Sequence, residues 1–284
     1  METESSLTEI RNAQKRHWTS VAAAWGKWFD WTEENFAPLT LWLRDQTGWR
    51  PGANVLDVGC GSGYPALAAA AAVRPGGTVA AIDISPGMIE VASRRAAESS
   101  LDNVTFQEMD AGALRFADET FDAVTCVCTL MFSAQPGRAL GEIRRVLKPG
   151  GRFGIVVWDE PSLNPFSMVL VNVVSQFIAL PALPGADAPG PFRFAAAGVL
   201  ESMLKSAQFS GFAIEDRRMT FEFPSVQAYM QIVSDVAGWA RRLQALSPDE
   251  RSRLRQSVTN AAQPYCVDGR VRMGAAVHCA VGGK

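Results

Sequence analysis

The feature that most constrains the fold is a short apolar segment that recurs five times between residues 54 and 158. The segments are continuous apolar runs, which is typical of strands buried on both faces of a parallel sheet. Turn residues and helical sequence separate them, and this alternation indicates helices on both faces of the sheet. The five predicted strands are residues 55–58, 78–84, 104–107, 121–128 and 152–158.

Two more strands complete the predicted sheet. They are residues 213–223 and residues 272–281, and we expect the last strand to be antiparallel. Between them, residues 225–262 predict helical structure with a fresh helix start at Ser247. The predicted fold class is therefore α/β, with a doubly wound, mostly parallel sheet of seven strands.

The chain divides into a helical front end and a sheet domain. Residues 1–49 predict a helical N-terminal lid, which we expect to end near Pro38 and residues 49–52. Residues 50–284 form the second predicted domain. A cap insertion at about residues 159–210 interrupts it, with an apolar helix and a loop rich in proline and glycine.

Composition excludes several classes of function. A net charge of -2 with a pI near 5.8 argues against a nucleic-acid partner. The five cysteines are odd in number and lack Cys-x-x-Cys spacing, so we expect neither a disulfide framework nor a metal site. The N-terminus has no signal-peptide region, and the apolar stretch of residues 166–180 is too short for a membrane span. We expect a cytoplasmic protein, and its oligomeric state stays open.

A glycine-rich turn, Asp57-Val58-Gly59-Cys60-Gly61-Ser62-Gly63, overlaps the end of the first strand. Glycines between a strand and a helix allow a tight turn and the close approach of a ligand to the backbone. Asp83 ends the second strand, 20 residues after Gly63, where a carboxylate can accept hydrogen bonds from both hydroxyls of a ribose. This combination predicts a nucleoside cofactor.

Two classes of cofactor use such a turn. A dinucleotide site has the pattern Gly-x-Gly-x-x-Gly, but Tyr64 takes the place of the third glycine. Asp57 adds negative charge, which disfavours a pyrophosphate and favours a cation. S-adenosylmethionine carries a sulfonium and an ammonium group and is therefore favoured. A nicotinamide-dependent oxidoreductase remains the less favoured alternative.

Residues 50–160 resemble the class I S-adenosylmethionine-dependent methyltransferases, and the flanks are similar to the small-molecule branch that methylates quinones and natural products. The resemblance implies a Rossmann-like fold, with S-adenosylmethionine as cofactor and S-adenosylhomocysteine as product. It rests on VLDVGCGSG (residues 55–63), AAIDISPGMIEVA (80–92), FQEMDAGALRFADETFDAV (106–124) and EIRRVLKPGGR (142–152).

The resemblance also implies which residues bind the cofactor. Three glycines contact the methionyl end, a carboxylate lies near its ammonium, and a second carboxylate holds the ribose. Two apolar side chains enclose the adenine, an Asp-Ala pair bonds its edge, and the end of the fourth strand lines the sulfonium side. In that order, these residues are Gly59, Gly61, Gly63, Asp57, Asp83, Ile84, Met88, Asp110, Ala111, Cys126 and Val127. A core role for Met88 and a turn role for Asp110 remain alternatives.

Tryptophan is concentrated at the front of the chain, where six of the eight lie within the first 49 residues. The i, i+7, i+10 spacing of Trp18, Trp25 and Trp28 predicts one helical face. This face either packs into the core or forms a wall for a small, largely apolar or aromatic acceptor. The residues predicted to contact the acceptor are Trp25, Trp28, Met131, Phe132 and Trp158.

Methyl transfer from a sulfonium is an in-line displacement with a good leaving group, so proximity is its main requirement. We predict no catalytic residue. His17 is either a base or substrate contact or an exposed or capping residue, whereas we expect a structural role for His278. The expected activity is methyl transfer to an O, N or C atom, and a non-catalytic protein that binds the same cofactor is the alternative.

Overall fold

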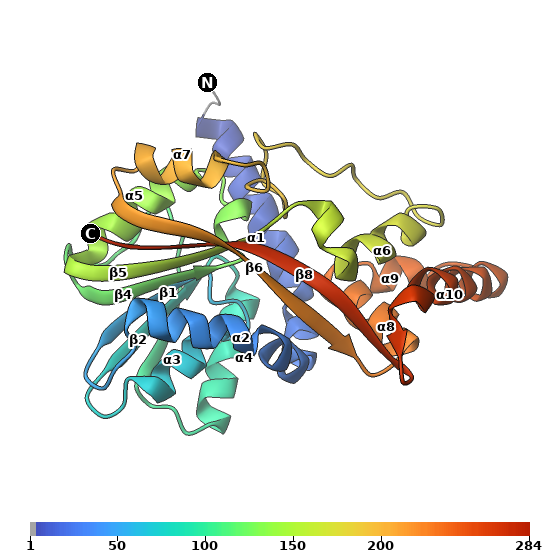
Figure 1. Cartoon of the computed structure of the whole chain (residues 1–284), viewed down its shortest axis with the longest axis horizontal. Coiled ribbons are helices and arrows are strands. Elements are labelled where there is room, and N and C mark those ends of the chain that lie inside the picture. The colour runs from blue at the N-terminus through green and yellow to red at the C-terminus, as the bar shows by residue number, and fades with distance from the viewer. Residues whose placement is uncertain (1–3) are drawn as a thin grey trace.

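The central sheet has the predicted parallel core and an antiparallel last strand. The computed structural model describes residues 4–284. Five strands pair in parallel, and the last long strand is antiparallel to both of its neighbours. The spatial order, shown in Figure 1, is β3 (Val104–Glu108), β2 (Thr78–Asp83), β1 (Asn54–Val58), β4 (Phe121–Val127), β5 (Leu147–Trp158), β8 (Arg270–Gly283) and β6 (Ser210–Phe223). A two-residue strand, β7 (Cys266–Val267), pairs with β8 and makes the eighth.

Both faces of the sheet are buried, as the continuous apolar runs predicted. Val55 of β1 belongs to one apolar cluster and the next residue, Leu56, to another. Val156 and Ile155 of β5 divide in the same way, because successive side chains of a strand point to opposite faces. The covering helices are α2 (Phe29–Thr47), α3 (Ala66–Ala72), α4 (Pro86–Glu98), α5 (Pro136–Val146) and α7 (Val199–Ser206).

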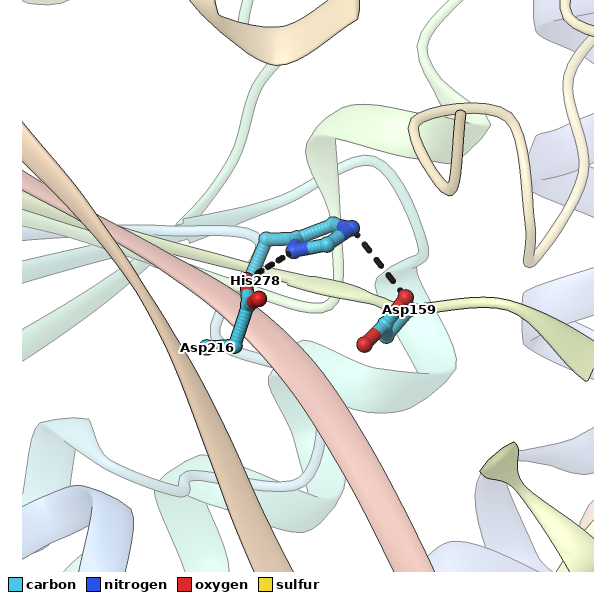
Figure 2. A group of neighbouring side chains, drawn as sticks. All are labelled: Asp159, Asp216 and His278. Atoms are coloured by element: carbon cyan, nitrogen blue, oxygen red, sulfur yellow. Dashed lines mark hydrogen bonds and ion pairs between the residues drawn. The ribbon is translucent and has the colours of Figure 1, made fainter. Parts of the chain in front are cut away.

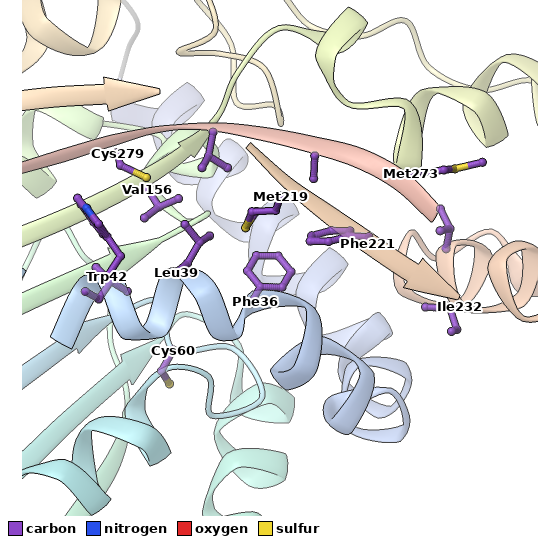
Figure 3. Packing of buried hydrophobic residues seen from close by; sticks show 14 of the residues in the cluster. Phe36, Leu39, Trp42, Cys60, Val156, Met219, Phe221, Ile232, Met273 and Cys279 are labelled. Carbon is purple, nitrogen blue, oxygen red and sulfur yellow. The ribbon is translucent and has the colours of Figure 1, made fainter. Parts of the chain in front are cut away.

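Helix α2 covers the middle of the sheet closely. Its residues Phe36, Leu39 and Trp42 lie against strands β5, β6 and β8 (Figure 3). A Cβ atom on Gly154 of β5 would lie 2.6 Å from the Leu43 side chain. Because glycine has no Cβ atom, helix α2 can pack this close to β5. Burial of these large apolar groups is the main contribution that α2 makes to stability.

The helical front end differs from the prediction at Pro38. The helical region was expected to end near Pro38 and residues 49–52, but Pro38 lies inside α2. The helix ends at Gly48, directly before residues 49–52, and the left-handed φ of 71° at Gly48 supplies the cap that stops it. The break comes earlier, at Trp28, which separates α2 from α1 (Glu4–Lys27).

Strands β6 and β8 extend past the parallel strands as a two-stranded arm. Residues 277–283 of β8 pair with β5, whereas residues 272–276 pair with β6 alone. Helices from two insertions gather at the far end of this arm (Figure 1). They are α6 (Pro165–Val174), α8 (Val226–Val236), α9 (Ala240–Gln244) and α10 (Pro248–Ala262).

The helical group on the arm is larger than the cap predicted at residues 159–210. Helices α8 and α10 both contact α6, although they come from the connection between β6 and β8. The helical region predicted over residues 225–262 is divided at Gly238, whose φ of +76° is left-handed. The predicted helix start at Ser247 is confirmed, because Ser247 and Glu250 form a capping box at the beginning of α10. Within residues 4–284, no helix is both long and apolar enough to cross a lipid bilayer.

Asn164 fastens the start of α6 to the sheet. It is fully buried, and its Nδ2 donates to the carbonyl oxygens of Asp159, Glu160 and Ala276 at 3.0, 3.0 and 3.2 Å. Its Oδ1 accepts from the backbone N–H of Ala276 at 2.9 Å. Every polar atom of the side chain therefore has a partner.

We expect Asn164→Ala to lower the free energy of unfolding by about 2–4 kcal/mol, because it leaves buried backbone groups without partners. Urea denaturation measures the change. The matched control is Asn260→Ala on the exposed face of α10, for which we expect a change of about 0.5 kcal/mol or less. Equal losses in the two variants would contradict this role of Asn164.

Candidate functional site

A cavity of about 440 Å³ lies at the carboxyl ends of the parallel strands. Gly59 follows β1, Asp83 ends β2, Val127 ends β4 and Trp158 ends β5, and all four line it. Helices α1, α2, α6 and α8 contribute the other walls. The position agrees with the general rule that open α/β sheets bind ligands beyond the carboxyl ends of their strands.

The glycine-rich turn is held against the sheet by backbone and side-chain hydrogen bonds. Gly59 has a φ of +73°, and a Cβ atom there would lie 2.1 Å from the Thr129 side chain. Thr129 Oγ1 donates to Gly59 O at 3.0 Å, so side-chain and backbone contacts fix the turn together. Gly61 donates its N–H to Asp83 Oδ2 at 3.0 Å. Gly63 packs toward Leu67 and does not line the cavity.

Asp57 is a buried carboxylate with one oxygen unused. Its Oδ1 accepts from Thr125 Oγ1 at 2.7 Å, and its Oδ2 has no hydrogen-bond partner. Burial raises the pKa of Asp57 to about 7, and the neighbouring charge of Asp83 contributes in the same direction. Asp57 does not itself line the cavity, but it lies behind the glycine turn that does.

Asp83 is the second buried carboxylate. It accepts from the backbone N–H groups of Gly61 and Ser85 at 3.0 and 2.9 Å. Burial raises its pKa to about 6, against the opposing effect of these hydrogen bonds. In the described part of the chain, no cationic side chain forms an ion pair with Asp57 or Asp83. The region behind the turn is therefore electrostatically suited to a cationic ligand.

The residues predicted to contact adenine lie together at one end of the cavity. Ile84, Met88, Asp110 and Ala111 all line it. Asp110 Oδ1 accepts from the backbone N–H of Gly112 at 2.9 Å, as expected of a turn-forming aspartate. Met88 is also core, because it packs with Val21 and Ala22 of α1 and with Val91 of α4. Both alternatives for Met88 and Asp110 are thus compatible with a cofactor contact.

Helix α1 closes this end of the cavity. Arg11 forms an ion pair with Asp110, but its Nε lacks a hydrogen-bond partner of good geometry. Lys15 pairs with Glu108, and Thr19 Oγ1 lies 3.0 Å from Ser85 Oγ. Arg11 and Gln14, which line the same wall, were not predicted from the sequence. They lie seven and four residues before Trp18, so the spacing of one helical face could have indicated them.

The other end of the cavity is aromatic. Trp18 lies edge-on to Phe132, with ring centroids 4.9 Å apart, and Phe166 contacts both Trp158 and Phe221 at 5.1 and 4.7 Å. Three of the five residues predicted to contact the acceptor line the cavity, although one of them, Trp25, packs against the cluster that contains Met88. They are Trp25, Phe132 and Trp158. Residues not predicted for this wall are Trp31, Phe36, Phe166, Met168, Phe221, Val233 and Trp239.

Trp28 and Met131 do not line the cavity. Trp28 lies at the break between α1 and α2, donates Nε1–H to Asp235 Oδ2 at 2.9 Å, and carries the Lys27 ammonium 4.4 Å from its ring centroid. The break takes it off the face that Trp18 and Trp25 share. Met131 is fully buried among the residues that join the sheet to α5 and α7.

The end of β4 separates the two ends of the cavity. Val127 lines the cavity, but the preceding residue, Cys126, points to the opposite face and is buried in the core. Cys128 and Thr129 continue the lining, and Cys128 has a left-handed φ of 50°, which is uncommon for a residue with a side chain. Neither residue was predicted, because this backbone conformation has no sequence pattern.

Few titratable side chains line the aromatic end. His17 does, and partial burial lowers its pKa, which favours the neutral imidazole. Tyr64 also lines the cavity, but its hydroxyl bonds Phe36 O and Thr40 Oγ1. Burial raises the pKa of Tyr64 well above its ordinary value, so it remains protonated.

Comparison with known proteins agrees with this geometry. Residues 50–172 match a family described as a methyltransferase domain. A demethylmenaquinone methyltransferase of Symbiobacterium thermophilum is 46% identical over 48% of this chain and 51% of its own length. Nocamycin O-methyltransferase of Saccharothrix syringae is 34% identical over 62% of this chain and 66% of its own length. The chain spans about half the length of the curated relatives it matches.

The fold is also shared with a solved structure. The YcgJ protein of Bacillus subtilis superposes with a TM-score of 0.56 at 21% identity, over 86% of this chain and 98% of that one. Its similarity extends beyond the segment that the domain family matches. Residues 50–172 are therefore a methyltransferase domain.

Proposed function

We propose that the protein transfers a methyl group from S-adenosylmethionine to an O, N or C atom of a small, largely apolar or aromatic acceptor, leaving S-adenosylhomocysteine. The observation that carries the proposal is one continuous cavity with two unlike ends. One end has carboxylates and the glycine turn, and the other is aromatic. Val127, Cys128 and Thr129 lie where the two ends meet.

The cofactor end has one group for each part of S-adenosylmethionine. Asp83 would hold the ribose hydroxyls, and Asp110 would accept from the adenine amino group between Ile84 and Met88. Asp57 Oδ2, which has no hydrogen-bond partner, would attract the positive charge of the cofactor from behind the glycine turn. When bound there, the cofactor supplies an electrophilic methyl group on a sulfonium. The residues of the chain orient it toward the aromatic end and exclude water.

The aromatic end supports a small apolar acceptor. Arg11 is the only Lys or Arg among the described residues that line the cavity, and it is paired with Asp110. The relatives named for demethylmenaquinone and nocamycin support a small molecule rather than a nucleic acid. We propose that residues 1–49 act as the lid and residues 159–210 as part of the cap over this acceptor.

Proximity is the main catalytic device in this proposal. A base is needed only when the acceptor must lose a proton as it attacks. His17 is the histidine that lines the cavity among the described residues, and burial lowers its pKa and so favours the neutral form, which can accept a proton from a hydroxyl acceptor. All five cysteines are free thiols, which supports the proposed cytoplasmic location.

The first prediction concerns cofactor identity. We expect S-adenosylhomocysteine to raise the melting temperature and NAD to leave it unchanged, because Tyr64 replaces the third glycine of a dinucleotide site. Calorimetric titration of Asp83→Ala should show S-adenosylhomocysteine affinity weakened roughly tenfold or more, since the ribose loses its acceptor. The Tm of unliganded Asp83→Ala must be recorded as well, because Asp83 also bonds the turn. Stabilisation by NAD alone would refute the proposal.

The second prediction concerns Asp57 and pH. Its raised pKa of about 7 means that the free protein holds a proton there at mildly acidic pH. A bound cation favours the carboxylate, so cofactor binding should release a proton, and affinity should rise with pH and level off above about pH 8. Titrations in two buffers of different ionisation enthalpy measure the release.

Asp57→Asn is the matched variant, because its amide oxygen can still accept from Thr125. We expect a smaller proton release in this variant and a weaker dependence of affinity on pH. Some release should remain, since burial also raises the pKa of Asp83 to about 6. An unchanged release in Asp57→Asn would remove Asp57 from the cofactor site.

The third prediction separates the two ends of the cavity. With an acceptor found by screening aromatic alcohols, amines and quinols, Phe166→Ala should raise the acceptor KM roughly tenfold through lost apolar contact. The affinity for S-adenosylhomocysteine should stay the same. Phe177→Ala is the control, because Phe177 packs on the same cluster without lining the cavity. Cofactor binding without turnover of any acceptor in the panel would favour the non-catalytic alternative.

A further inference from the structure

A group of ionisable side chains lies outside the cavity, where the cap begins and where its loop returns. Asp159 directly follows β5, Asp216 lies on β6, and His278 lies on β8 between them (Figure 2). In the strand register Asp216 is directly opposite His278, and Val157 is opposite it on the other side. All three side chains are therefore on one face of the sheet.

The two nitrogens of His278 have different surroundings. Nδ1 lies 2.7 Å from Asp216 Oδ1, a short hydrogen bond that places a proton on Nδ1. Nε2 lies 3.3 Å from Asp159 Oδ1 and 3.3 Å from the carbonyl oxygen of Ala195. With the proton on Nδ1, the lone pair of Nε2 faces Asp159 Oδ1 and the Ala195 carbonyl oxygen, and none of these three atoms carries a proton to donate. Three acceptor atoms placed so close together are stabilised by a positive charge between them.

Distance favours a metal ion over a second proton on the ring. A charge-assisted N–H···O bond is about 2.7–2.9 Å long, shorter than either contact of Nε2. Ligands bound at about 2.0–2.2 Å to a first-row divalent ion lie about 3.0–3.5 Å from one another, which is the spacing observed here. Asp159, Asp216 and His278 each offer one ligand atom, and these three atoms lie within 4.8 Å of one another.

We propose that His278 Nε2, the Asp159 carboxylate and the Ala195 carbonyl bind a divalent first-row transition metal, with Zn²⁺ as the best match. A mixed nitrogen and oxygen donor set suits zinc and its neighbours better than Ca²⁺ or Mg²⁺, which take oxygen ligands. Asp216 orients the imidazole from behind, as carboxylates do for many metal-bound histidines. Water completes the coordination on the open side.

Burial agrees with these roles. The side chains of Asp159 and His278 are 9% and 15% exposed, whereas that of Asp216 is 68% exposed. The two proposed ligands are thus sheltered, and the orienting carboxylate faces solvent. Asp159 Oδ1 also accepts from the backbone N–H of Glu160 at 2.6 Å, which fixes the carboxylate.

The bound metal joins the beginning of the cap to its returning loop. Asp159 follows Trp158, which lines the cavity, and Ala195 belongs to the loop that leads into α7. A metal on both would restrain the wall of the cavity without contacting the cofactor or the acceptor. The proposal does not depend on methyl transfer, so its failure and that of the proposed activity are distinguishable.

The test uses the full chain, stripped of metals with a chelator that is then removed. Isothermal titration with Zn²⁺ should show one site that Ca²⁺ and Mg²⁺ do not fill. Zinc at a tenfold excess over Kd should raise the Tm by about 2–3 °C. His278→Gln should abolish this site, and Asp216→Asn should weaken it about 10–100-fold by removing the orienting carboxylate.

His17→Gln is the matched control and should bind zinc as the unaltered chain does, because His17 lies on α1 away from this group. Asp159→Asn provides a second ligand variant should His278→Gln not fold, and Co²⁺ absorption reports coordination directly. Absence of saturable zinc binding, or binding that persists in both ligand variants, would overturn the proposal and leave His278 as an ion-pair residue only.

Discussion

The constraint on which the rest of the structure depends is the burial of Asp57 and Asp83 at the carboxyl ends of β1 and β2. Burying a carboxylate is costly unless hydrogen bonds or a cation offset the lost hydration. Thr125 and the backbone N–H groups of Gly61 and Ser85 supply part of this compensation. Gly61 has a positive φ, so the backbone conformation of the turn contributes directly to the stabilisation of Asp83.

Most of the cofactor end could be predicted from the sequence, because it depends on short-range patterns. Strand β1, the turn and Asp83 follow from apolar runs, glycine spacing and a fixed separation along the chain. The misplaced residues fail for local geometric reasons. Cys126 and Val127 are neighbours on one strand, so both cannot face the cavity. Trp28 leaves the aromatic face because α1 ends one residue before it, which the i, i+7, i+10 spacing does not reveal.

The acceptor end could be predicted only in part, because distant segments assemble it. Phe166, Phe221 and Trp239 reach the cavity from α6, β6 and the start of α9, and no local pattern links those three segments. The same holds for Asp159, Asp216 and His278, which the strand order brings together across three strands. The pairing of distant strands determines the contacts among Asp159, Asp216 and His278, so they can be recognised only once the strand order β5-β8-β6 is known.

The two-stranded arm of β6 and β8 has a consequence for how such a protein can change. Helices α8, α9 and α10 lie at its far end and make their main contacts with one another, with α1 and α6, and with the two strands of the arm. Of these helices, α8 and the residue before α9 line the aromatic wall. Substitutions there would change the shape of the aromatic wall at a distance from the glycine turn, so evolution can alter the two ends of the cavity by different substitutions.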